Sequence, residues 1–85
     1  MFQKLIAMYE KGAITADHLV VEALQMVDPR YPETVLDLLP PEVLERTRKY
    51  TDDYGPRRMR SNYGSQPAVD QIEAARHWFE AKVEK

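Results

Sequence analysis

The stretch from Ile14 to Val27 constrains the fold more than any other part of the sequence. At 100° per residue its apolar side chains cover an arc of roughly 160°, wider than the ~100° stripe of a typical surface helix. Thr15 can cap this helix, and Ile14 and Leu19 have the spacing of a hydrophobic staple. A helix this apolar needs neighbours on more than one side, so we expect it at the centre of a small helical fold. The arc consists of Leu19, Val20, Ala23, Leu24, Met26 and Val27.

The size and composition of the chain indicate one soluble globular domain. Its 85 residues are 44% hydrophobic and 31% charged, which is not the composition of a disordered chain. The absence of cysteine excludes disulfides, thiolate metal sites and thiol nucleophiles. No apolar run reaches the ~20 residues of a membrane helix. The early charges at Lys4, Glu10 and Lys11 leave no room for a signal-peptide core, so a cytoplasmic protein is expected.

Glycine and proline divide the chain into four main helices and one short helix bounded by prolines. We predict helices over Met1–Lys11, Ile14–Val27, Pro32–Leu39, Pro41–Tyr54 and Ala68–Lys82. The joints between the first four are short, which favours a compact orthogonal bundle over residues 1–54. The predicted core consists of Phe2, Leu5, Ile6, Tyr9, Ile14, Leu19, Val20, Ala23, Leu24, Val27, Val35, Leu36, Leu39, Val43, Leu44, Thr47 and Tyr50.

One segment resembles a known short motif. An amphipathic helix that ends in Lys11-Gly12, followed by Ile14-Thr15 and a second helix, is similar to the SHOCT-type helical hairpins over about residues 4–24. The resemblance implies a helical hairpin. The second helix of those hairpins is charged, whereas the one here is apolar, so no function is carried over.

The most distinctive charged feature is a basic loop over residues 55–67, between the fourth helix and the helix at 68–85. Residues 1–45 carry a net charge of −5, whereas residues 46–60 carry +4. Arg57, Arg58 and Arg60, with Tyr63 beside them, could hold phosphate groups and stack a base. The same arginines could instead pair with the acidic N-terminal half, or belong to a flexible solvated loop. We expect this loop to be the most mobile internal segment, with the final helix reaching another chain or packing against the bundle.

Two apolar residues fall away from the buried faces of their helices. Val21 lies opposite the main arc of its helix, and Trp78 lies nearly opposite Val69 on the last helix. Tryptophan is enriched at binding hot spots, although it can also fold onto the domain's own surface. These residues indicate a small non-catalytic interaction or adaptor module that binds protein and self-associates. The alternative is an anion-binding protein, with nucleic acid as a less favoured partner, that uses the basic loop.

Catalytic, cofactor and metal sites are not predicted. His18 with Glu22, and Glu73 with His77, have the i, i+4 spacing of paired ligands, but a zinc site needs three or four ligands. The serines of the basic loop have no histidine neighbour, and the three glycines are scattered rather than grouped as a phosphate loop. The sequence therefore favours a protein that is not an enzyme.

Overall fold

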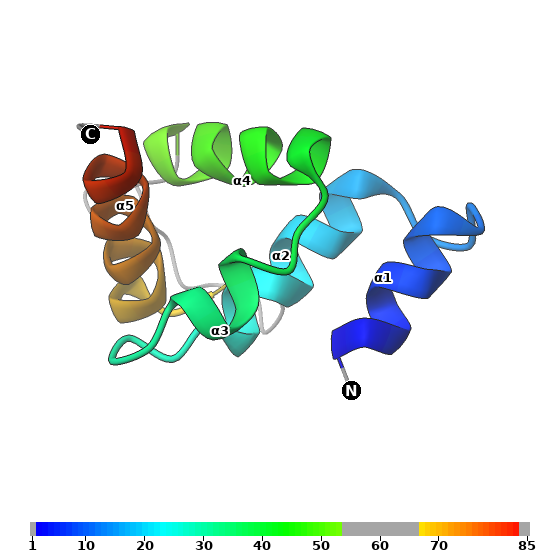
Figure 1. The fold of residues 1–85 in the computed structure, drawn as a ribbon, viewed down its shortest axis with the longest axis horizontal. Coiled ribbons are helices and arrows are strands. Elements are labelled where there is room, and N and C mark those ends of the chain that lie inside the picture. The colour runs from blue at the N-terminus through cyan, green and yellow to red at the C-terminus, as the bar shows by residue number, and fades with distance from the viewer. Residues whose placement is uncertain (1, 54–66, 84–85) are drawn as a thin grey trace.

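The computed structural model describes residues 2–53 and 67–83, and within them every regular element is a helix (Figure 1). The helices are α1 (Phe2–Glu10), α2 (Ala16–Met26), α3 (Glu33–Leu36), α4 (Pro41–Asp53) and α5 (Val69–Val83). This confirms the all-α fold class and the order of the predicted helices. No helix in the described ranges is long and apolar enough to cross a membrane.

α2 is the central helix of the fold, as predicted. It contacts α1, α3, α4 and α5, so each of the other helices covers part of its surface. Figure 1 shows α2 running behind α3 and below α4, with α1 on one side and α5 on the other. Leu19, Ala23 and Leu24 are completely buried and Val20 is nearly so. The wide apolar arc thus matches a helix that is enclosed on several sides.

The hairpin of α1 and α2 is fixed by the two capping groups predicted from the sequence. At the end of α1, Gly12 has a φ of 81°, and its N–H donates to the Tyr9 carbonyl at 3.0 Å. The Ala13 N–H donates to the Met8 carbonyl at 2.8 Å, which completes a Schellman motif. At the start of α2, the His18 N–H donates to Thr15 Oγ1 at 3.1 Å. Local chemistry therefore determines where α1 ends and α2 begins.

Replacing Gly12 by alanine is expected to lower the free energy of unfolding by about 1 kcal/mol, because an L-residue is strained at this φ. An added Cβ would meet no atom within 4 Å, so backbone strain accounts for the whole loss. Urea unfolding measures the effect. The matched control is Gly12→Asn, which tolerates the left-handed region better and should lose less stability. Equal losses in the two variants would contradict the explanation.

α3 is shorter than predicted. The sequence indicated a helix over Pro32–Leu39, whereas the α-helical part ends at Leu36. The N–H groups of Leu38 and Leu39 bond to carbonyls three residues back, at 3.0 and 3.3 Å, so the chain tightens into turns. The physical reason is Pro40-Pro41, since a residue before proline avoids the α region and proline has no N–H to donate. Leu38 lies in this tightened turn and has 45% of its surface exposed.

α4 buries a stripe that contains two threonines. Val43, Thr47 and Thr51 are completely buried. The two threonines can be buried because their hydroxyls donate hydrogen bonds within the helix. Thr47 donates to the Val43 carbonyl and Thr51 to the Arg48 carbonyl, each at 2.8 Å. The Tyr9 hydroxyl of α1 donates to Glu42 Oε2 of α4 at 3.0 Å, and this hydrogen bond raises the pKa of Tyr9. Thr51 was on the predicted face of α4 but not in the predicted core.

α5 belongs to the same core as the other helices, which corrects the predicted core. That prediction ended at Tyr50, but Ile72 and Ala75 are completely buried and Phe79 is nearly so. The final helix was expected either to reach another chain or to pack against the bundle. In the structure α5 packs against α2 and α4 of its own chain. The Gln71 amide fixes it there, because Nε2 donates to the carbonyls of Gln25 (2.6 Å) and Val27 (3.2 Å).

The predicted core residues are otherwise confirmed. Each is either buried or half-buried and packed against the buried cluster. The half-buried ones come mainly from α1 and from the two edges of the buried stripe of α4, and are Leu5, Ile6, Tyr9, Ile14, Leu44 and Tyr50.

Candidate functional site

Two grooves flank the buried stripe of α4. At 100° per residue, the α4 residues that line one groove lie to one side of Val43, Thr47 and Thr51 on the helix surface. The α4 residues that line the other groove lie to the other side. The α2–α4 groove has a volume of about 340 Å³ and is lined by Asp17, Val20, Val21, Arg46, Lys49, Tyr50 and Asp53. The α4–α5 groove has a volume of about 440 Å³ and is lined by Asp37, Pro41, Leu44, Glu45, Arg48, Trp78, Phe79 and Lys82.

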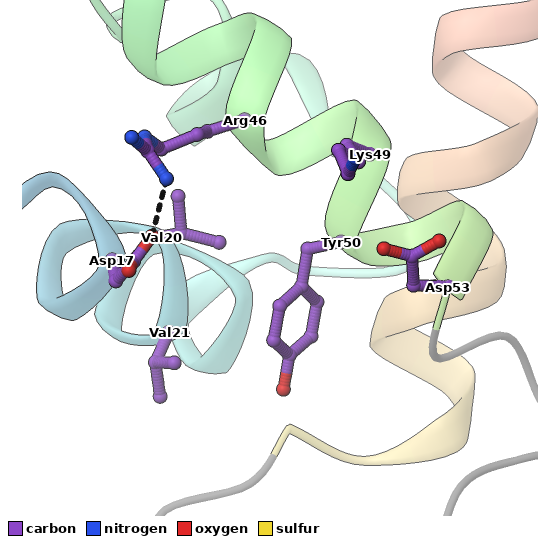
Figure 2. A pocket seen from close by; sticks show the side chains of 7 residues that line it. All are labelled: Asp17, Val20, Val21, Arg46, Lys49, Tyr50 and Asp53. Atoms are coloured by element: carbon purple, nitrogen blue, oxygen red, sulfur yellow. Dashed lines mark hydrogen bonds and ion pairs between the residues drawn. The ribbon is translucent and has the colours of Figure 1, made fainter.

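Four of the side chains that line the α2–α4 groove are charged, and they stand beside Val20, Val21 and Tyr50 (Figure 2). Arg46 Nη1 of α4 lies 2.9 Å from Asp17 Oδ1 of α2 and ties the two helices together across one end. Figure 2 shows Val21 and Tyr50 projecting on the same side, away from this ion pair. The two charged side chains are 58% and 80% exposed, so the pair contributes at most about 1 kcal/mol.

The α4–α5 groove is lined by two aromatic side chains of α5, Trp78 and Phe79. Leu44 and Pro41 of α4 face Trp78 and Phe79 of α5 across it. The rings of Trp78 and Phe79 meet edge to face, with centroids 5.0 Å apart and an interplanar angle of 82°. Phe79 is buried, whereas Trp78 is half-buried and packs against the core with one part of its surface. The indole is therefore held in place by its own chain while part of it remains open to solvent.

Loose ion pairs border the α4–α5 groove. Lys82 Nζ lies 3.9 Å from Asp37 Oδ1 and 5.1 Å from the centroid of the Trp78 ring. Arg48 Nη1 lies 4.0 Å from Glu45 Oε2. All four side chains are about half-exposed or more, so each pair is weak and can be rearranged at little energetic cost.

The two residues predicted to bind a partner lie in different grooves. Val21 is half-buried and lines the α2–α4 groove, whereas Trp78 lines the α4–α5 groove, and the two grooves share no residue. The α4 side of each groove was not predicted from the sequence. A signal was present, because positions 41, 44, 45 and 48, and positions 46, 49, 50 and 53, each follow the i, i+3, i+4, i+7 spacing of one helix face.

The predicted anion-binding residues lie outside the described residues. Arg57, Arg58, Arg60 and Tyr63 all fall between residues 54 and 66. Anion binding by the basic loop therefore stays a prediction.

The histidines lie in two separate polar clusters. His18 Nε2 is 3.4 Å from Glu22 Oε2 on α2. His77 lines a hollow on α5 with Glu73, Arg76 and Glu80. Within residues 2–53 and 67–83, no group of three histidine, aspartate or glutamate side chains is placed to hold a metal ion.

Comparison with known proteins gives no relative. No family model matches the chain, and neither a curated protein nor a solved structure matches it. The candidate function therefore depends on the geometry of the grooves.

Proposed function

We propose that this chain is a small, non-catalytic protein-interaction module that associates with itself, and that the α4–α5 groove is its contact surface. The observation that carries the proposal is the position of Trp78. Its indole is fixed against Phe79 and the core, yet it is only partly buried and lines a mostly apolar groove.

The physical argument is that such a side chain contributes to binding at low entropic cost. A tryptophan whose rotamer is already fixed loses little freedom when a partner covers it. Its apolar surface, together with that of Leu44 and Pro41, is removed from water when a partner fills the groove. Buried aromatic anchors of this kind dominate the energetics of protein interfaces. The α2–α4 groove has no tryptophan in its lining, and its Val21 is a smaller apolar side chain than Trp78 and would contribute less.

The test is the mass of the protein in solution as a function of concentration. The monomer has a mass of 9.9 kDa, and we expect the weight-average mass in sedimentation experiments to rise above this value with concentration. Trp78 is the single tryptophan, so its fluorescence reports directly on this groove and should shift to shorter wavelength as the protein associates.

Trp78→Ala should weaken the association, whereas Met8→Ala should not, because Met8 is exposed on α1 and lines neither groove. Circular dichroism checks that both variants keep the helical fold. A constant monomer mass up to millimolar concentration would contradict self-association. A wild-type mass that rises equally in Trp78→Ala would contradict the choice of groove.

A further inference from the structure

An exposed apolar side chain stands at the edge of the α4–α5 groove. Leu38 is 45% exposed and lies directly after Asp37 and three residues before Pro41, both of which line the groove. The segment that carries it is anchored, because Leu36 is completely buried and Leu39 is nearly so. The Leu38 N–H also donates to the Val35 carbonyl at 3.0 Å. Leu38 is therefore a fixed projection beside an apolar hollow.

The charges around the groove are balanced. Asp37 and Glu45 provide two negative charges, and Arg48 and Lys82 provide two positive charges. A polyanion or a strongly charged peptide would meet as many like charges as opposite ones here. A surface with the same balanced charges offers an opposite charge to each of the four, and the weak ion pairs within the chain can exchange for pairs across an interface.

A projection beside a hollow, with balanced charges, is the arrangement that a two-fold contact requires. When two copies meet about a two-fold axis, residue i of one copy contacts residue j of the other, and j contacts i. An axis between the projection and the hollow would place each Leu38 opposite the groove of the other copy.

We propose that the α4–α5 groove is filled by a second copy of this chain, with Leu38 of each copy seated against Trp78 and Leu44 of the other. This inference rests on the proposed function and adds the identity and the symmetry of the contact. Arg48 and Lys82 of one copy then face Asp37 and Glu45 of the other.

The first experiment replaces the projection. Leu38→Asp should raise the dissociation constant of the dimer at least about tenfold, because it places a charge in an apolar hollow. The matched control is Met26→Asp, since Met26 is also an exposed apolar residue, at 36%, but neither it nor its chain neighbours Gln25 and Val27 line a groove. Both positions are on the surface, so both variants should fold, and circular dichroism checks this. Equal dissociation constants for Leu38→Asp and the wild type would overturn the proposal.

The second experiment exchanges the charges. A basic variant carries Asp37→Lys and Glu45→Lys, and an acidic variant carries Arg48→Glu and Lys82→Glu. Each variant alone has like charges around the groove and should self-associate at least about tenfold more weakly than the wild type. An equimolar mixture should form a one-to-one heterodimer that weakens with added salt. A mixture that associates no better than its components would overturn the proposal.

These outcomes separate the inference from the proposed function. A wild-type protein that self-associates, with no effect of Leu38→Asp or of the charge exchanges, would overturn this two-fold contact and leave self-association intact. A wild-type protein that remains monomeric at every concentration would overturn both the two-fold contact and self-association.

Discussion

Replacing Leu24 by alanine is expected to lower the free energy of unfolding by about 2–5 kcal/mol. Leu24 is completely buried on α2, the helix that contacts all four others, so the structure around it has little freedom to collapse into the cavity. The loss combines the transfer free energy of the removed atoms with the cost of that cavity. At roughly 0.05–0.15 kcal/mol per residue a domain of this size has a total stability of about 4–13 kcal/mol, so the variant could lose most of it.

Urea unfolding followed by circular dichroism measures this effect. The midpoint should fall while the slope of the free energy against urea stays the same, because the surface exposed on unfolding hardly changes. Met26→Ala is the matched control, since Met26 is on the same helix with 36% of its surface exposed, and its loss should be much smaller. An unchanged midpoint for Leu24→Ala would show that α2 is not the central helix.

The sequence was most informative where structure depends on neighbouring residues. Thr15 and Gly12 were identifiable because a cap needs only a hydroxyl or a positive φ at one position, and both were confirmed. The central position of α2 was also predictable, because an apolar arc wider than one stripe can be buried only by several neighbours. These features depend on short stretches of sequence, so they can be predicted without knowing the rest of the fold.

The end of α3 was predicted incorrectly because two local signals compete there. The apolar spacing of Val35, Leu36 and Leu39 favours a continued helix, whereas Pro40 and Pro41 oppose it. The prolines tighten the last turn instead of simply stopping the helix after Leu39. The tightened turn carries Leu38, which is 45% exposed and follows Asp37 of the α4–α5 groove.

The grooves could not be predicted because each combines residues that are distant in sequence. A helix over Ala68–Lys82 was predicted, but the sequence of one helix does not identify the helices against which it packs, and the predicted core contained no residue of α5. Trp78 was recognised as unusual on its own helix. Its position opposite Leu44 depends on how α4 and α5 meet, and that packing is a property of the whole fold.

Replacing Ile72 by alanine is expected to lower the free energy of unfolding by about 2–5 kcal/mol, which would place α5 in the same cooperative unit as α2 and α4. Ile72 is completely buried and lies next to Gln71, whose amide bonds to the end of α2. The loss of its side chain should therefore disturb the contact of α5 with the rest of the core. The matched control is Val69→Ala, because Val69 begins the same helix but is 38% exposed, and its loss should be small.

Two probes in one urea titration decide whether α5 unfolds with the other helices. Trp78 fluorescence reports on α5, because Trp78 is the single tryptophan of the chain, whereas circular dichroism reports on all helices. In a cooperative domain the two transitions coincide, and Ile72→Ala should move both to the same lower midpoint. If α5 were only loosely attached, Ile72→Ala would shift the fluorescence transition alone and leave the circular dichroism midpoint near its original value. Because the α4–α5 groove exists only while α5 is docked, that result would also remove the basis for a stable binding surface around Trp78.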